Sequence, residues 1–200
     1  GLVVKSLTDH WSAGLTGAAG SSIFSNYDFR ARLAPGIEYD VFPYSQSTTG
    51  MLTILYTIGP EVADYEEETI YGKTSETLLS HQLEASLDLR QPWGSASSSV
   101  EIAQYLNDAD KYRVSAFGAL SIRLFKGFEV EVSGEASRRR DQLSLRRGDA
   151  TNEEILVRQR ELATGYQYEF NFGFSYSFGS IDNNVVNQRF VRAAHDREIA

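Results

Sequence analysis

Residues 166–178 alternate without exception: each even position is aromatic, and each odd position is polar, charged or glycine. A period of two indicates a β-strand whose two faces meet different surroundings. Thirteen extended residues span roughly 43 Å, whereas strands of soluble proteins usually have about 5–6 residues. A strand that crosses an outer membrane needs about 9–11 residues and carries aromatic side chains where lipid meets water. The stretch therefore predicts a transmembrane β-strand.

The same alternation continues along the chain and predicts an all-β fold of eight long strands, preceded by a partial strand in residues 1–6. The expected long strands cover residues 11–23, 27–42, 51–58, 76–90, 95–105, 112–124, 128–136 and 166–178. We also expect long loops at 59–75 and 138–165, and a bulge or bend at Pro35 and Gly36. Residues 153–157 fit either a strand extension or a short helix.

Connection lengths indicate how these strands are arranged. Short turns follow residues 7, 42, 90 and 124, and longer connections follow residues 58, 106 and 142. Short and long connections at alternate ends are typical of outer-membrane barrels, whose periplasmic turns are short. The expected fold is an antiparallel up-and-down transmembrane β-barrel over residues 1–190, with residues 191–200 as a C-terminal tail.

Composition excludes several other classes of protein. The formal net charge of −8 argues against a nucleic-acid partner, and the absence of cysteine excludes disulfides and thiol chemistry. The chain has no apolar run long enough for a transmembrane helix. Residues 1–6 lack the charged start and apolar core of a signal peptide, although a barrel must be exported. Either the signal has been removed or the chain is a fragment, and we favour the fragment because residues 1–6 already fit the end of a strand.

Charged side chains occupy the face opposite the apolar positions in several of these strands. A dry core cannot hold so many charges, whereas a wet barrel interior with crossed ion pairs can. They form either a structural ion-pair network that fills a narrow barrel, which we favour, or the lining of a selective pore. The predicted lumen residues are Arg30, Arg32, Glu38, Asp40, Glu84, Asp88, Arg90, Arg113, Arg123, Glu129, Glu131 and Glu135.

The strand at residues 166–178 is expected to close the barrel by pairing with the first strand of the longer protein. Its aromatic side chains are expected to face lipid. They are Tyr166, Tyr168, Phe170, Phe172, Phe174, Tyr176 and Phe178.

Two clusters of like charge lie in the predicted loops. The basic cluster consists of Arg138, Arg139, Arg140, Arg146 and Arg147, with Arg158 and Arg160 further on. It fits either contact with the phosphates of lipopolysaccharide, which arginine binds bidentately, or a solvated loop rim. The acidic cluster consists of Asp64, Glu66, Glu67 and Glu68. We interpret it as a solvated run, with a divalent-cation site as the alternative.

Catalytic chemistry has little support in the sequence. The three histidines, His10, His81 and His195, fall in a turn, a strand and the tail, so we do not expect them to converge. Ser80 and His81 are adjacent, but neighbours on a strand point to opposite faces. A barrel-embedded lipid hydrolase is the first alternative function. A soluble β-barrel that binds a small ligand inside its aromatic face is the second.

Several longer phrases resemble an uncharacterised family of Gram-negative outer-membrane β-barrel proteins. The phrases are residues 9–15, 37–45, 65–71, 73–78, 91–95, 123–127, 153–166 and 176–181. The resemblance covers nearly the whole chain, implies this fold and location, and brings no catalytic motif. It also implies a barrel of about twelve strands, of which this chain holds the C-terminal two-thirds. Gln188 stands where the family has proline, and residues 191–200 run past Phe190, where the family normally ends.

Pattern and resemblance together predict an integral protein of the bacterial outer membrane, porin-like in architecture. Its expected role is that of a non-enzymatic structural anchor, an assembly partner or a narrow pore. Expected partners are outer-membrane lipid, lipopolysaccharide, the barrel-assembly machinery and the N-terminal remainder of the same barrel. No cofactor is expected.

Overall fold

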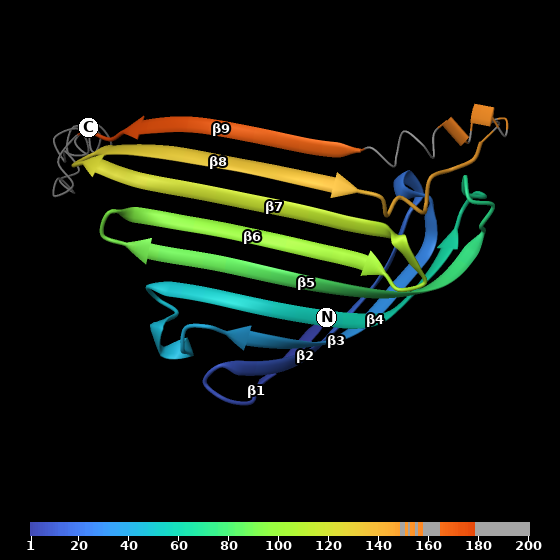
Figure 1. Cartoon of the computed structure of the whole chain (residues 1–200), viewed down its shortest axis with the longest axis horizontal. Coiled ribbons are helices and arrows are strands. Elements are labelled where there is room, and N and C mark those ends of the chain that lie inside the picture. Colours follow the sequence, from blue (N-terminus) through green and yellow to red (C-terminus); the bar gives the residue numbers. More distant parts are fainter. Residues whose placement is uncertain (149–150, 152, 155, 158–164, 179–200) are drawn as a thin grey trace, which may run out of the picture.

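The computed structural model describes residues 1–148, 151, 153–154, 156–157 and 165–178, and contains one antiparallel sheet of nine strands (Figure 1). The strands lie side by side in chain order. They are β1 (Leu2–Ser6), β2 (Trp11–Ser22), β3 (Tyr27–Asp40), β4 (Gly50–Tyr65), β5 (Ser75–Gln91), β6 (Gly94–Tyr105), β7 (Asp108–Phe125), β8 (Phe128–Arg139) and β9 (Tyr166–Tyr176). Two short 3₁₀ helices, η1 (Ile23–Ser25) and η2 (Tyr44–Gln46), lie between strands. Within the described ranges, every helix is too short or too polar to cross a membrane.

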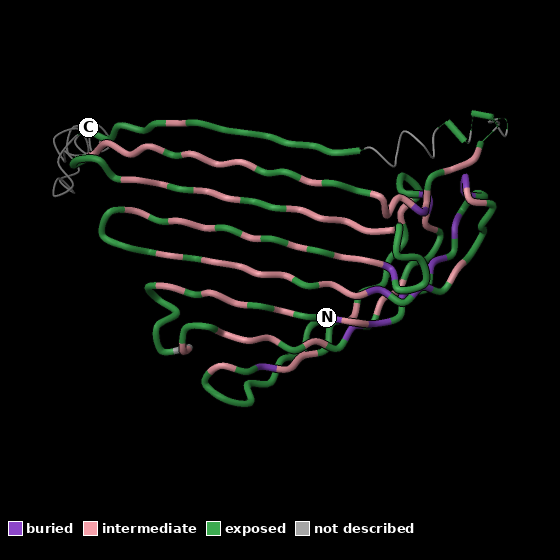
Figure 2. The backbone as a smooth tube through the Cα atoms, in the orientation of Figure 1, coloured by how far each residue is buried: buried purple, intermediate pink, exposed green. Residues whose placement is uncertain are grey.

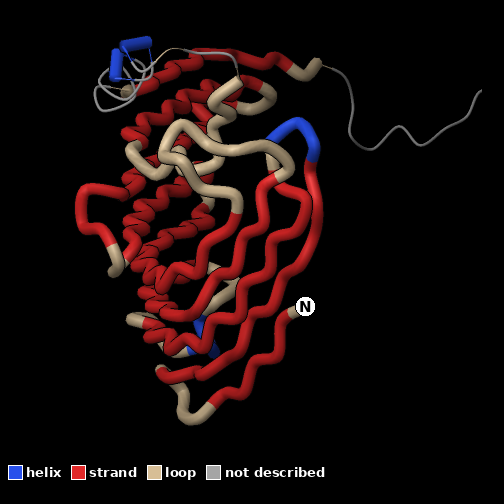
Figure 3. The backbone as a smooth tube through the Cα atoms, turned by 90° about the vertical axis from the view of Figure 1, so that its right-hand side faces the viewer, coloured by secondary structure: helices blue, strands red, loops and turns tan. Residues whose placement is uncertain are grey.

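The prediction of an all-β, antiparallel up-and-down fold with eight long strands and a short first strand is confirmed. The long strands have between 11 and 18 residues, well above the usual length in soluble proteins. In the described part of the chain β1 and β9 do not pair with each other, so the sheet stays open. Its curvature is visible from the end in Figure 3. The closed transmembrane barrel remains a prediction.

The register assigns the side chains of the sheet to two faces, because residues directly opposite on antiparallel strands share a face. One row crosses eight strands through Ser12, Glu38, Leu55, Glu84, Glu101, Ser115, Ser137 and Gln167. The neighbouring row lies on the other face and runs through Trp11, Tyr39, Ile54, Ala85, Val100, Ala116, Ala136 and Tyr168. We call these the charged face and the apolar face.

The two ends of the sheet differ in how they are covered. At the loop end, residues 66–74 and 140–147 leave the sheet and cross its charged face, where Tyr71 and Leu143 pack against Leu78 and Tyr105. The turn end holds the connections β1–β2, β3–β4, β5–β6 and β7–β8. Most buried residues gather at the loop end (Figure 2). The only sizeable packed region of the described chain is thus a loop-covered end.

The predicted loop at residues 59–75 is wrong in its first half, because β4 continues to Tyr65. Gly59 and Pro60 interrupt the sequence pattern and suggested a loop. A Cβ atom at Gly59 would lie 1.9 Å from the carbonyl oxygen of Leu33 on β3. The two backbones approach so closely there that only glycine fits within the strand.

Of the bulge or bend expected at Pro35 and Gly36, the bulge is contradicted by the register of the sheet. The register of β3 against β4 is the same on both sides of these residues, and it shifts instead between Tyr27 and Phe29. This irregularity places Tyr27 opposite Tyr65, with ring centroids 5.5 Å apart. Strict alternation would have put Tyr27 on the apolar face beside Phe29.

Connection lengths follow the prediction only in part. The β6–β7 connection, expected to be longer, consists of Leu106 and Asn107, whereas residues 41–49 at the turn end match residues 66–74 in length. The long connection at residues 140–165 is present. Within it Glu153, Glu154, Leu156 and Val157 are helical, so this part does not extend a strand.

Candidate functional site

All twelve charged residues predicted for the lumen lie on the charged face. Those of β3 and β5 alternate with apolar neighbours, and the register continues the same face across β7 and β8. The ion pairs that they form with other described residues lie at the loop end.

Glu61 of β4 is the central buried acid of this face, with only 3% of its side chain exposed. Its Oε1 accepts a hydrogen bond from Nε of Arg30 at 2.8 Å and another from the hydroxyl of Tyr105 at 3.4 Å. The Arg30 guanidinium also lies 5.2 Å from the ring centroid of Tyr27. A buried carboxylate with these partners is compensated in charge and in hydrogen bonding.

Arg32 lies two residues further along β3 and has a different environment. Its Nε donates to Oγ of Ser80 at 3.1 Å and its Nη2 to Oγ1 of Thr57 at 3.4 Å. Arg32 therefore contacts hydroxyl groups rather than carboxylates in the described structure.

Arg113 of β7 forms the second group of ion pairs at the loop end. Its guanidinium reaches Glu101 at 2.7 Å and Asp141 at 3.3 Å. Asp141 belongs to the segment that crosses the face, so this pairing ties a connection to the sheet.

Between the Arg30, Arg32 and Arg113 side chains lies a cavity of about 70 Å³, also lined by Ser80 and Tyr105. That volume suits a small number of water molecules or a small ion and excludes a lipid or a nucleotide.

Residues 66–70 and 145–147, two segments distant in the sequence, contact each other over the loop end. We call this pair of segments the charge clamp. Arg146 contacts Glu66 at 3.4 Å and Glu67 at 3.1 Å, and Arg147 contacts Glu68 at 3.6 Å. The predicted acidic run thus meets part of the predicted basic cluster. Among the described residues no group of three or more histidine, cysteine or acidic side chains is arranged to hold a metal ion.

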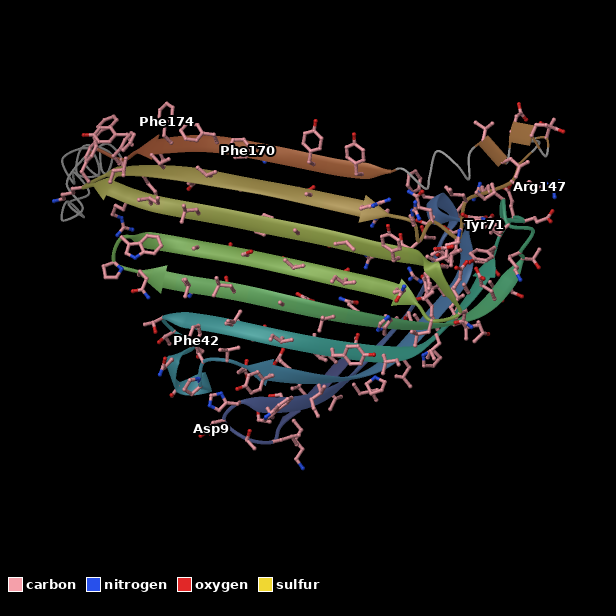
Figure 4. All side chains as sticks on the ribbon, viewed as in Figure 1. Asp9, Phe42, Tyr71, Arg147, Phe170 and Phe174 are labelled. Atoms are coloured by element: carbon pink, nitrogen blue, oxygen red, sulfur yellow. The ribbon has the colours of Figure 1, made fainter. Side chains whose placement is uncertain are left out.

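Backbone hydrogen bonds reinforce the charge clamp. Thr69 and Arg146 form an isolated antiparallel bridge, flanked by the bonds from Ile70 N to Leu145 O at 2.8 Å and from Arg147 N to Glu68 O at 2.9 Å. Thr69 is fully buried. Figure 4 shows Tyr71 and Arg147 at this crowded end, far from Phe42 at the turn end.

Asn26 joins three connections at the loop end. Its Nδ2 donates to the carbonyl oxygens of Glu67 and Ser144, and its Oδ1 accepts from the Glu67 N–H. Its backbone is left-handed, with φ of 60°, a conformation that asparagine tolerates better than most residues. Asn26 therefore links the β2–β3, β4–β5 and β8–β9 connections, although its sequence context indicated only a loop.

The basic cluster predicted from the sequence divides into three environments. Arg139 belongs to the charged face, opposite Arg113, and Arg146 and Arg147 belong to the charge clamp. Arg138 and Arg140 lie beside the ring of Tyr112, at 5.8 and 5.7 Å from its centroid. Arg158 and Arg160 lie outside the described residues.

Ser80 and His81 occupy opposite faces, as predicted. The Ser80 hydroxyl is buried and contacts Arg32 and the Gly59 carbonyl. His81 lies on the apolar face between Tyr56 and Gln104, at 3.3 and 3.2 Å. His10 contacts the Asp40 carbonyl in the turn end, and His195 lies outside the described residues. Arginine beside Ser80 supplies no general base.

The seven predicted lipid-facing aromatics are among the most exposed large side chains, at between 57% and 85%. An aromatic side chain buries about 150–250 Å² when it is fully covered. Seven such side chains, exposed to this degree, therefore present on the order of 1,000 Å² of mostly apolar surface. The largest apolar patch of a soluble monomer is usually about 300–600 Å². Figure 4 shows Phe170 and Phe174 along β9, at the edge of the sheet.

Four important residues were absent from the sequence-based site: Asn26, Glu61, Glu101 and Tyr105. Glu61 lay in the predicted loop at residues 59–75. Glu101 is the one charged residue of a serine-rich strand, so no row of charges marked its face. Alternation from Ser95 onward would have placed Glu101 and Tyr105 on the charged face. No comparable signal marks Asn26.

Comparison with protein-family models, with curated proteins and with solved structures found no match for this chain. The resemblance to an outer-membrane family therefore stays a prediction.

Proposed function

We propose that this chain forms part of the wall of an integral outer-membrane β-barrel, with its apolar face toward lipid and its charged face around a narrow, ion-paired interior. Its role is that of a structural anchor, an assembly partner or a narrow pore. The observation that carries this proposal is the register, which separates charged from apolar side chains over eight long strands. A sheet with one face in lipid and one in a polar interior requires this separation.

Closure follows from the same physics. An edge strand in lipid would leave its N–H and C=O groups without hydrogen-bond partners. In a membrane the outer edges of β1 and β9 must therefore pair, either with each other or with additional strands. The experiments below consequently use the full-length protein.

The two alternative functions fit the contacts less well. A lipid hydrolase at Ser80 would need a general base, whereas Ser80 contacts Arg32 and a carbonyl oxygen. A soluble ligand-binding barrel would need its aromatic face inside. The connections instead cover the charged face, where Tyr71 and Leu143 pack on Leu78 and Tyr105.

Detergent dependence is the first test. We expect the full-length protein to aggregate in buffer and to be monodisperse in detergent. In vesicles, the fluorescence of Trp11 and Trp93, which lie exposed at the turn end, should be quenched by lipids brominated near the headgroup. A monodisperse protein in detergent-free buffer would overturn the proposal.

A pair of neighbouring substitutions tests the assignment of the two faces. Phe172 lies opposite Val132 on the apolar face, and Asn171 lies opposite Ser133 on the charged face. Phe172→Arg should destabilise the protein folded in vesicles by about 2–4 kcal/mol, because the arginine side chain then faces lipid. Asn171→Arg is the matched control and should cost much less. Equal effects would contradict the assignment.

Single-channel recording in planar bilayers separates the pore from the other roles. The ion-paired loop end and its small cavity favour low or no conductance in the unmodified protein. Large, stable current steps would show an open channel and would exclude a purely structural role. Absence of steps in the folded, inserted protein would exclude the pore.

A further inference from the structure

We propose that Arg138, Arg140 and Tyr112 form a binding site for the phosphate group of an anionic membrane lipid. The site lies at the loop-end rim of the apolar face. This inference rests on the proposed function, because only a protein inserted in a membrane presents that rim to lipid headgroups.

The β7–β8 pairing brings the three side chains together. Arg138 is the penultimate residue of β8 and lies opposite Val114 of β7. Arg140 follows β8, and its backbone N–H donates to the carbonyl oxygen of Tyr112 at 2.8 Å. The two guanidinium groups lie 5.8 and 5.7 Å from the centroid of the Tyr112 ring. One aromatic ring therefore keeps two positive charges close together.

The alternation of the strand separates this pair from the other arginines of the cluster. Arg139, between them, lies opposite Arg113 on the charged face. Arg146 and Arg147 contact Glu66, Glu67 and Glu68 in the charge clamp. Of the five described arginines of this basic cluster, only Arg138 and Arg140 lie beside Tyr112.

Arg138 requires a counter-charge in a membrane. Its side chain is exposed, and no carboxylate of the described residues lies within ion-pair distance of it. An arginine at the edge of the hydrocarbon is costly unless an anion or water solvates it. The planar guanidinium matches the oxygens of a phosphate, with which it forms two parallel charge-assisted hydrogen bonds. Lipid phosphates lie at that depth in a bilayer.

Aromatic side chains mark this rim as the boundary between lipid and headgroups. Tyr166 lies directly opposite Arg138, and it stacks with Tyr168 at a centroid distance of 6.4 Å. Both rings are more than 70% exposed. Tyrosine is enriched at the membrane–water interface, where its ring meets lipid and its hydroxyl meets water. The arginine pair is thus flanked by residues that favour headgroup depth.

The test uses native mass spectrometry of the full-length protein in detergent, with phosphatidic acid as the phosphomonoester probe and phosphatidylcholine as the neutral reference. We expect phosphatidic acid to be retained in preference to phosphatidylcholine. The variant R138Q/R140Q should weaken that retention about tenfold, as expected from the loss of charge-assisted hydrogen bonds. The single variant R138Q should also weaken retention. Its matched control, R139Q, removes one positive charge from the other face and should leave retention unchanged.

Several outcomes would overturn the proposal. Equal loss in R138Q/R140Q and R139Q would indicate nonspecific attraction to positive charge. Full displacement of phosphatidic acid by millimolar inorganic phosphate would indicate a site for free phosphate rather than lipid. If the double variant does not fold, retention is measured in R138Q alone. That variant should fold, because Arg138 makes no ion pair within the described structure. Failure of the proposed function is distinguishable, since the protein would then be monodisperse without detergent.

Discussion

The loop end and the turn end of the charged face balance their charges in different ways. At the loop end Glu61 is buried against Arg30, Arg113 is shared by Glu101 and Asp141, and the charge clamp closes over them. Glu84 lies in the middle of the face, directly opposite Glu101. From there to the turn end the face carries Glu38, Asp40, Asp88, Arg90, Arg123, Glu129 and Glu131, and the described residues form no ion pair there. Among the described residues, the same face thus holds a packed network of ion pairs at one end and charges without an ion-pair partner at the other.

This difference has a physical cause. At the loop end, connections cross the face and exclude water, so each charge needs a partner within hydrogen-bond distance. At the turn end, hairpins such as Arg90–Gly94 and Arg123–Phe128 leave the face uncovered. Water can solvate those charges, and pairing adds little. Stability should therefore depend on loop-end charges far more than on turn-end charges.

The largest effect is expected from Glu61→Ala. It leaves Arg30 without its carboxylate and opens a cavity below Tyr105, which should lower the free energy of unfolding by about 3 kcal/mol. Denaturant unfolding, in the medium that keeps the protein monodisperse, measures this. Glu84→Ala removes a carboxylate from the less covered part of the same face and should cost less than about 1 kcal/mol. Similar losses in both variants would refute the difference between the ends.

Asn26→Ala should have the next largest effect. It removes three hydrogen bonds that join three connections and places alanine at φ of 60°. We expect a loss of about 2–3 kcal/mol, part of it from backbone strain. Asn26→Gly removes the same bonds without that strain, so it should recover about 1 kcal/mol. If glycine restored full stability, the hydrogen bonds would contribute nothing.

A smaller effect is expected from the charge clamp, whose ion pairs are partly exposed. Arg146→Ala should cost about 1 kcal/mol and should expose residues 66–74 to proteases. High salt should act in the same direction, because 1 M salt shortens the screening length to about 3 Å. Lys126→Ala, in the turn-end hairpin, is the matched control. Unchanged cleavage in Arg146→Ala would show that the clamp is held without the Arg146 ion pairs, by the backbone bridge at Thr69 and the Arg147–Glu68 pair.

The sequence predicted the fold where side chains alternate and failed where backbone geometry decides. Alternation located all nine strands and placed the twelve predicted lumen residues together on one face of the sheet. It missed the second half of β4, because Gly59 and Pro60 are typical loop residues. Glycine is needed at position 59 because the backbone of Leu33 on the neighbouring strand lies too close for a side chain, and the sequence does not show that contact. It also misplaced Tyr27, because a register shift changes which face a residue occupies.

The site was less predictable than the fold, because its contacts join distant segments. The acidic residues 66–68 and Arg146 and Arg147 were each recognised as clusters, but nothing in the sequence indicated that they meet. Their pairing depends on the path of residues 140–147 across the loop end. The same holds for Asn26, whose partners lie 41 and 118 residues away.

The smallest effect, and the sharpest check on the turn end, is expected from Arg90→Gln and Arg123→Gln. Neither arginine forms an ion pair with any described residue, and both are exposed. Each substitution should change the free energy of unfolding by less than about 0.5 kcal/mol. Arg113→Gln at the loop end removes the same charge but breaks contacts with Glu101 and Asp141, so it should cost clearly more. A loss above about 1 kcal/mol in Arg90→Gln or Arg123→Gln would show that the turn-end charges are paired in the assembled protein, as in an interior closed by further strands.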